Sequence, residues 1–285
     1  MSIDPQTPNL GRIGVWRHAY GLTPEFVQSV EKLGYGTLWL GGSPPADLSI
    51  AEEVLDATTT LTVATGITNI WVSPAAEVAE SFHRLEARHP GRFLLGVGVG
   101  HPEASADVYA KPYQAVVSYL DELDAAGVPA GRRVLAALGP KMLRLAADRA
   151  AGAHPYLTTP EHTREARELL GATPLLAPEH KVVLDTDPVA ARAVGRPPVD
   201  NPYLHLRNYV ANLTRLGFTE DELADGGSDR VIDALVAHGG ATAIAARLTE
   251  HLDAGANHVA VQVLPSDRDE LPALAALAES LALRG

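Results

Sequence analysis

The sequence predicts a single α/β domain, spanning residues 1–285, with the architecture of a (β/α)8 TIM barrel. Short apolar runs alternate with helical stretches eight times along the chain. Proline beside a small or polar residue recurs where an apolar run passes into a helix, which is the composition of a helix start. No Gly/Ser-rich or charge-rich linker divides the 285 residues. One large barrel is therefore favoured over two domains or a doubly wound sheet.

The predicted strands are short, apolar and each followed by helix. They lie at 13–16, 37–42, 62–68, 92–101, 134–139, 153–157, 180–185 and 258–264. Helices are expected to begin at Thr23-Pro24, about Asp47, Ser73-Pro74, about Lys111, Gly139-Pro140, Thr159-Pro160 and Asp187-Pro188. Extra helical segments between strands seven and eight are expected at 189–194, 203–217, 228–238 and 240–254, and a last helix at 270–283.

Composition excludes several classes of function. A hydrophobic fraction of 46% with 20% charged residues is typical of a globular protein with a large core. The net charge of −12 disfavours nucleic-acid and anionic-membrane partners, which need a basic face. The absence of cysteine excludes disulfides, thiolate zinc sites and thiol catalysis. Because no apolar run reaches the ~18 residues of a membrane span, we expect a cytoplasmic protein. We expect no metal site.

The most informative stretch is RFLLGVGVGH, residues 92–101. Its apolar start is typical of a strand covered on both faces. Gly96, Gly98 and Gly100 then remove side chains toward the strand end, which usually marks a place where another backbone or a flat ligand comes close. His101 follows as the first titratable group at that edge, and imidazole can exchange a proton near neutral pH.

A second informative stretch is LGPKM, residues 138–142. With Gly139 as N-cap and Pro140 as the first helical residue, the N–H groups of Lys141 and Met142 are expected to point out free at the positive end of a helix. This arrangement favours an anion such as a phosphate. A solvated lysine at an ordinary helix start is the alternative.

Four blocks of the sequence together resemble a known family. They are ATGITNIWVSPAA (64–76), HPGRFLLGVGVGH (89–101), AALGPKMLRLAADRAAGAHPYL (136–157) and GGSDRVIDALVAHG (226–239). In this order they are similar to the bacterial luciferase-like superfamily, and most similar to the actinobacterial oxidoreductases that use the deazaflavin coenzyme F-420. The resemblance implies a (β/α)8 barrel that binds a flavin or deazaflavin ring at the carboxyl ends of its strands and often forms a homodimer.

The resemblance also implies roles for residues at these strand ends. It implies a non-prolyl cis peptide at Gly66-Ile67 behind the ring, where an ordinary bulge is the alternative, and a ring contact for Asn69, which could equally cap a turn. His101 stands where better-known members carry a catalytic acid; the alternative is a histidine that only anchors the ring. The implied cofactor-binding residues are Gly41, Gly66, Ile67, Thr68, Asn69, Gly98, Gly100, His101, Leu138, Gly139, Pro140, Lys141, Met142, His154 and Pro155.

The resemblance predicts an oxidoreductase that transfers a hydride between coenzyme F-420 and a small organic substrate. One departure concerns the Asp-His pair that sugar-phosphate dehydrogenases of this group carry after the second strand. Gly41-Gly42-Ser43 replaces it here, which argues against a sugar phosphate. An FMN-dependent monooxygenase and a catalytically silent barrel that binds a flavin or a lipid are the alternatives. The sequence does not specify the substrate.

Overall fold

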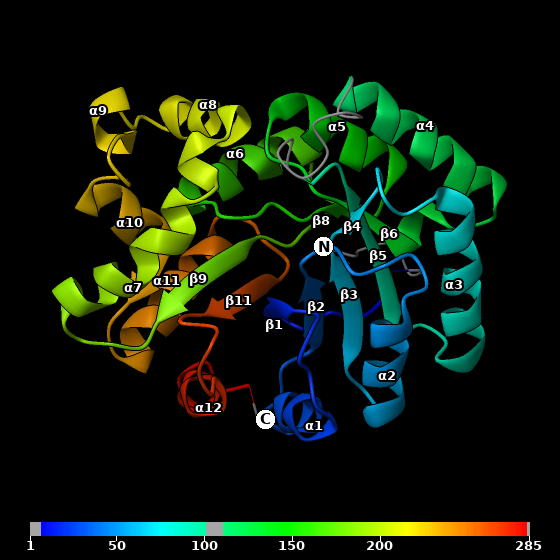
Figure 1. Cartoon of the computed structure of the whole chain (residues 1–285), viewed down its shortest axis with the longest axis horizontal. Helices are drawn as coiled ribbons and strands as arrows, with labels where there is room; N and C mark the ends of the chain where they lie inside the picture. Colours follow the sequence, from blue (N-terminus) through cyan, green and yellow to red (C-terminus); the bar gives the residue numbers. More distant parts are fainter. Residues whose placement is uncertain (1–6, 101–110, 284–285) are drawn as a thin grey trace.

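The computed structural model describes residues 7–100 and 111–283. Within them the strands form one curled parallel sheet, with helices on its outside (Figure 1). The strands are β1 Ile13–His18, β2 Thr37–Gly41, β3 Thr62–Gly66, β4 Thr68–Asn69, β5 Phe93–Gly98, β6 Arg133–Leu135, β7 Gly152–Ala153, β8 Leu175–Leu176, β9 Glu179–Val183, β10 Val236–His238 and β11 Val259–Val263.

The strand order is β10-β9-β11-β1-β2-β3-β5-β6-β7-β8, with β4 paired to β5. The α/β class and the parallel, barrel-like curvature are thus confirmed, but the predicted closed ring of eight strands is not observed. The predicted seventh strand, 180–185, corresponds to β9, which pairs with β11; β8 is an additional short strand that pairs with β7 and was not predicted. β10 pairs with the other edge of β9 and ends the sheet.

Twelve α-helices are found in the described residues, and they cover the outside of the sheet. They are α1 Pro24–Lys32, α2 Ser49–Ala57, α3 Ala75–Arg88, α4 Pro112–Ala125, α5 Pro140–Arg149, α6 Pro160–Leu170, α7 Pro188–Asp200, α8 Arg207–Arg215, α9 Glu220–Leu223, α10 Asp229–Leu235, α11 Ala241–Asp253 and α12 Leu271–Ser280. Short 3-10 turns lie at Ala130–Arg132 (η2) and Tyr203–His205 (η3).

The helix starts follow the predicted capping chemistry. Thr23 and Thr159 accept hydrogen bonds from the backbone N–H groups of Phe26 and His162, and proline occupies the first helical position after each. Asp187 caps α7 in the same way, by accepting from Val189. The sequence therefore predicted these helix starts correctly from local chemistry alone.

The strands predicted at 134–139 and 153–157 are shorter in the structure, as β6 and β7, and the helix predicted at 203–217 is divided into η3 and α8. Two further segments differ more strongly. The helix expected over 228–238 ends at Leu235, and Val236–His238 is β10. The helix α7, expected to end near residue 194, continues to Asp200 with two prolines inside it. Its buried residues are Ala191, Gly195 and Val199. In both places tertiary packing outweighs local preference.

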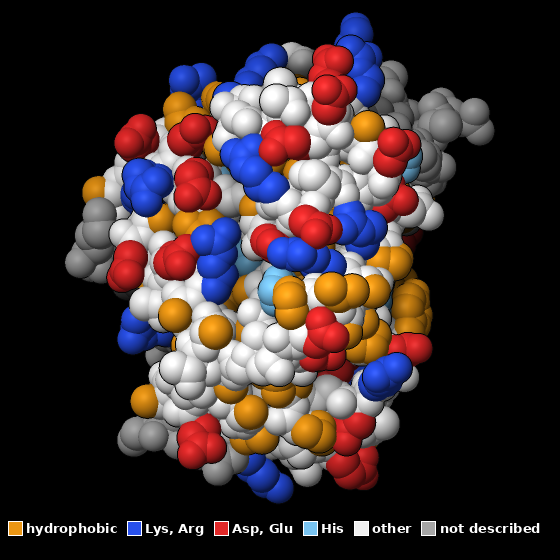
Figure 2. Space-filling model, turned by 90° about the vertical axis from the view of Figure 1, so that its left-hand side faces the viewer, with side chains coloured by type: hydrophobic (Ala, Val, Ile, Leu, Met, Phe, Trp, Pro, Cys, Tyr) orange, Lys and Arg blue, Asp and Glu red, His pale blue; other side chains and the backbone are white. Residues whose placement is uncertain are grey.

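The apolar core consists of a main cluster, a smaller cluster of strand residues around Trp39, and a separate cluster under the helices between β9 and β11. This separate cluster joins residues of α7, η3, α8 and α10, which lie together on the left side of Figure 1. On the face seen in Figure 2, acidic and basic side chains are interspersed. Ion pairs of Arg192 with Asp229 and Asp233 tie α7 to α10. The inserted segment is therefore packed as a unit beside the barrel.

The described part of the chain contains neither a helix that could span a membrane nor a cluster of metal-ligating side chains. None of its helices combines the length and the apolar character needed to cross a membrane. Across residues 7–100 and 111–283, no three His, Cys, Asp or Glu side chains are grouped so that they could hold a metal ion.

Candidate functional site

A cavity of about 750 Å³ lies at the carboxyl ends of the strands. Its lining comes from the strand ends, the start of α5 and the segment inserted between β9 and β11. The lining residues are Trp16, His18, Gly42, Ser43, Gly66, Ile67, Asn69, Val99, Gly100, Pro112, Tyr113, Ala136, Ala137, Leu138, Gly139, Pro140, Lys141, Met142, His154, Tyr156, Lys181, Pro198, Asn201, Pro202, Tyr203, Asn208, Tyr209, Gln262, Leu264 and Ser266. Its position is the usual location of an active site in barrel-like α/β proteins.

Most of the predicted cofactor-binding residues meet in this lining. Those that line the cavity are Gly66, Ile67, Asn69, Gly100, Leu138, Gly139, Pro140, Lys141, Met142 and His154. Gly41, Thr68, Gly98 and Pro155 lie at the same strand ends but are not among the lining residues. His101, the predicted catalytic residue, lies outside the described residues. The contact of these residues with a cofactor stays a prediction.

The glycines of β5 are required by the packing of the protein itself. A Cβ atom on Gly96 would lie 1.9 Å from the carbonyl oxygen of Thr65, and one on Gly98 would lie 2.7 Å from the Cβ of Ala136. Thr65 also exchanges hydrogen bonds with the Gly96 backbone, at 2.7 and 2.8 Å. The sequence offered two explanations for these glycines, a nearby backbone or a flat ligand. At Gly96 the nearby backbone is the reason.

The turn after β3 has the cis peptide that the resemblance implies. The peptide bond between Gly66 and Ile67 is cis. Asn69 is 4% exposed and its Oδ1 accepts a hydrogen bond from the Trp71 N–H at 3.1 Å. Asn69 thus caps a turn and also lines the cavity.

The start of α5 forms one end of the cavity, and here one expectation is wrong. The Met142 N–H is not free, because it donates to the Gly139 carbonyl at 3.1 Å. Lys141 does lie at the helix start, and its Nζ is 4.0 Å from the centre of the Tyr113 ring. The ring faces the ammonium group with its negative π surface, which holds the charge at the cavity edge.

The floor of the cavity contains two buried nitrogen atoms without hydrogen-bond partners among the described residues, Nε1 of Trp16 and Nε2 of His154. His154 stacks on Trp39 with ring centres 4.0 Å apart, and its Nδ1 lies 2.7 Å from the Ala177 carbonyl oxygen. That contact fixes Nδ1 as the donor and leaves Nε2 as a bare acceptor. Burial lowers the pKa of His154 to about 4, so it is neutral near pH 7.

Another part of the cavity lining, at β9 and β11, holds a buried ion pair. Lys181 on β9 is 1% exposed, and its Nζ donates to Glu179 at 3.1 Å, to the hydroxyl of Tyr156 at 2.7 Å and to Gln262 at 2.9 Å. The second carboxylate oxygen of Glu179 accepts from the Leu157 N–H at 2.9 Å. Burial raises the pKa of Glu179, whereas the charge of Lys181 opposes that shift.

The sequence interpretation missed this end of the cavity. Its residues come from β9, β11 and the inserted segment, which are far apart in the chain. Two signals could have found it: Lys181 and Gln262 are polar residues inside the apolar runs HKVVL and HVAVQVL. A polar residue in a buried strand needs a partner and therefore points to a site.

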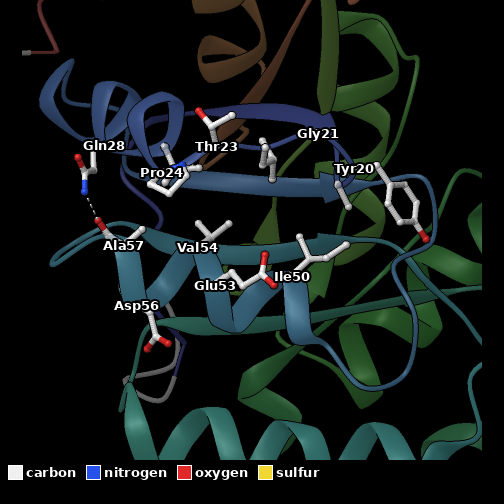
Figure 3. A pocket seen from close by; sticks show the side chains of 13 residues that line it. Tyr20, Gly21, Thr23, Pro24, Gln28, Ile50, Glu53, Val54, Asp56 and Ala57 are labelled. Atoms are coloured by element: carbon white, nitrogen blue, oxygen red, sulfur yellow. Dashed lines mark hydrogen bonds between the residues drawn. The ribbon is translucent and has the colours of Figure 1, made fainter.

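A second hollow of about 700 Å³ lies between α1 and α2 (Figure 3). Figure 3 shows Val54 and Ile50 of α2 facing the turn that carries Tyr20 and Thr23. Its carboxylates are Glu53 and Asp56, and Gln28 spans it by donating to the Ala57 carbonyl at 3.1 Å. It has no counterpart of the buried network around Lys181 within its lining. The strand-end cavity is therefore the candidate active site.

The sequence and the fold have counterparts among known proteins. The sequence model of the luciferase-like monooxygenase family matches residues 7–126, which carry β1 to β5. No curated protein matches the sequence.

Solved structures share the fold over nearly the whole chain. An F-420-dependent secondary alcohol dehydrogenase, in complex with an F-420–acetone adduct, superposes with a TM-score of 0.73 at 16% identity over 95% of this chain and 98% of its own. The coenzyme F-420-dependent tetrahydromethanopterin reductase of Methanopyrus kandleri gives 0.68 at 15% identity over 95% and 98%. The oxygenating constituent of 3,6-diketocamphane monooxygenase from a Pseudomonas putida plasmid, in complex with FMN, gives 0.70 at 14% over 95% and 96%. At these identities the likeness establishes the fold.

Proposed function

We propose that this protein is a luciferase-like oxidoreductase that binds coenzyme F-420 and transfers a hydride between it and a small organic substrate. The observation that carries the proposal is the cavity at the strand ends, which runs from the turn after β3 to the start of α5. The family match to residues 7–126 and the two F-420-dependent enzymes of the same fold support it.

The residues present fit a deazaflavin. Ile67, Val99 and Ala136 give the cavity an apolar wall suited to a flat ring, and Asn69 adds an amide beside it. Lys141 at the start of α5 suits an anionic tail, because the helix dipole and the ammonium group both favour negative charge there. When bound, a reduced deazaflavin would supply a hydride; the chain would hold the ring and exclude water.

The runner-up is an FMN-dependent monooxygenase, which the FMN-bound structure of the same fold favours. Its cofactor would occupy the same cavity. A barrel that binds a flavin or a lipid without turnover is the third candidate. The homodimer, the actinobacterial origin and the cytoplasmic location implied by the sequence stay predictions.

Fluorescence titration of the purified protein with coenzyme F-420 and, separately, with FMN tests the proposal. We expect low micromolar binding of coenzyme F-420, weaker binding of FMN, and affinity for coenzyme F-420 that falls with added salt because its tail is anionic. Tighter FMN binding would favour the monooxygenase. Failure of both to bind would contradict the proposal.

A further inference from the structure

The end of the cavity lined by β9 and β11 contains a tyrosine hydroxyl held by a buried ammonium group. Tyr156 and Lys181 both line the cavity, and the Lys181 Nζ donates to the Tyr156 Oη at 2.7 Å. The Tyr156 hydroxyl in turn donates to Gln262 Oε1 at 2.8 Å. An ammonium group at this position stabilises the negative charge that develops on the phenol oxygen when the phenol gives up its proton.

The charge of Lys181 is balanced within the protein. Its three hydrogen bonds go to Glu179, Tyr156 and Gln262. Glu179, which is fully buried, supplies one negative charge at 3.1 Å. This end of the cavity therefore presents hydroxyl and amide groups instead of a free cation, and it suits an uncharged oxygen better than a carboxylate or a phosphate.

We propose that Tyr156, held by Lys181, exchanges a proton with the oxygen of an uncharged alcohol or carbonyl substrate bound at this end of the cavity. The proposal rests on the proposed hydride transfer and adds to it the substrate class and the proton-exchanging group. Lys181 is a positioning residue that acts through Tyr156.

Other titratable groups of the described lining are less suited. His154 cannot donate a proton near neutral pH, because its Nδ1 is committed to the Ala177 carbonyl and its pKa is about 4. Lys141 lies at the other end, against Tyr113. His18 is exposed, and burial of part of its ring together with the charge of Lys181 lowers its pKa. The titratable group of Tyr156, by contrast, accepts a hydrogen bond from a buried cation.

The proton and electron balance is complete for reduction of a ketone. A reduced cofactor, when bound, would supply the hydride that forms a C–H bond at the carbonyl carbon while the C=O π bond breaks, so the substrate would gain the two electrons that the cofactor gives up. The carbonyl oxygen takes the proton of the Tyr156 hydroxyl. The Tyr156 oxygen then takes a proton from the Lys181 ammonium, and water returns a proton to Lys181. Oxidation of a secondary alcohol follows the reverse sequence.

Several charged or titratable groups face Tyr156 and shape its pH dependence. Burial is the main cause that raises its pKa, so it stays a neutral phenol and can act as a donor across the neutral range. The groups around it are Lys181 and Glu179 on β9, Tyr203 on η3 and Tyr209 on α8. His18 on β1 interacts with the charge of Lys181.

The first test measures binding in the cofactor-free protein by saturation-transfer NMR, with cyclohexanone and cyclohexanecarboxylate as probes. We expect cyclohexanone to bind and the carboxylate to bind at least tenfold more weakly. Tyr156→Phe should weaken cyclohexanone binding several-fold, because one hydrogen bond to the probe is lost. Tyr35→Phe is the matched control, since Tyr35 is a buried tyrosine outside the cavity that donates to the Leu274 carbonyl at 2.8 Å. Equal binding of both probes, no binding of cyclohexanone, or no effect of Tyr156→Phe would overturn the proposal.

The second test measures steady-state ketone reduction with reduced coenzyme F-420. Tyr156→Phe should lower kcat by ~10² or more with cofactor affinity unchanged, because proton transfer is lost only in the transition state. The double variant Lys181→Met/Glu179→Gln removes both buried charges together and leaves the Tyr156 hydroxyl in place. Its profile of kcat against pH should lose one limb.

His101→Ala belongs in the same series. If it lowers kcat by ~10² while Tyr156→Phe does not, His101 is the proton-exchanging group and the proposal is overturned. If the wild-type protein binds neither cofactor, the proposed function fails, and the binding test still decides whether this end of the cavity recognises an uncharged oxygen.

Discussion

The two ends of the cavity each carry a lysine, but the lysines are held in opposite ways. Lys141 is exposed at the start of α5 and lies over Tyr113, and no carboxylate in the described residues forms an ion pair with it. Lys181 is buried and bound to Glu179, Tyr156 and Gln262. An exposed, unmatched cation attracts an anion, whereas a buried, matched cation orients its neighbours. The cavity thus combines an anion-attracting end with a neutral, hydrogen-bonding end.

The largest expected effect comes from breaking the buried pair. Lys181→Met leaves Glu179 buried without its cation, which should lower the free energy of unfolding by about 3–5 kcal/mol. Adding Glu179→Gln removes the stranded charge and should restore most of that loss. Urea unfolding of the three proteins checks this. Equal stability of the single and double variants would show that the pair is not energetically coupled.

Glu270 is a second buried carboxylate that can be compared with Glu179. Glu270 is 3% exposed and its nearest cation is Arg17, whose Nε lies 3.3 Å away. Burial raises the pKa of Glu270 to about 7, and the charge of Arg17 only partly opposes this. The folded protein then holds this proton to a higher pH than the unfolded chain does. Its stability should therefore fall as pH rises from about 4.5 to about 7, by up to about 3 kcal/mol.

Glu270→Gln should remove that fall. Urea unfolding at several pH values between 5 and 8, for the wild-type protein and the variant, measures it. Parallel curves for the two proteins would mean that Glu270 already titrates at its ordinary pKa.

The anion-attracting end was largely predictable from the sequence, because its signals are local. Glycines at the end of an apolar run, and glycine followed by proline and lysine at a helix start, specify backbone conformation within a few residues. The helix starts at Thr23 and Thr159 were predictable for the same reason.

The neutral end was not predictable, because Tyr156, Lys181, Tyr203 and Gln262 come together only in the folded chain. The strand β10 was missed for a related reason. Its residues continue the helical pattern of 228–235, and only pairing with β9 makes them a strand. Likewise, β8 and β9 are separate strands because they pair with different neighbours, β8 with β7 and β9 with β11.

Gly96 in β5 and Gly139 at the start of α5 should differ in their tolerance of a side chain. Gly96→Ala should lower stability by about 1–3 kcal/mol, because the new Cβ would overlap the Thr65 carbonyl oxygen. Gly139→Ala should cost less than about 1 kcal/mol, because nothing lies within 4 Å of a Cβ there and φ is −90°. Thermal unfolding of both variants checks the order. A larger loss at Gly139 would contradict this account of the packing.

The smallest effect on stability is expected at Lys141. Lys141→Glu should change the free energy of unfolding by less than about 1 kcal/mol, since it removes only an exposed contact with Tyr113. Binding of coenzyme F-420 should weaken by about 1–3 kcal/mol, because an attraction becomes a repulsion. Lys32→Glu, on α1 and outside the cavity lining, is the matched charge reversal. Equal losses of stability and affinity would make Lys141 a structural residue.

The most direct test of the account is a crystal structure of the protein with coenzyme F-420. The account predicts the deazaflavin ring in the strand-end cavity against Ile67 and Val99, the anionic tail at the start of α5 beside Lys141, and the space next to Tyr156 left open for a substrate. A ring bound against Tyr156 and Lys181, or a cofactor bound outside this cavity, would contradict it.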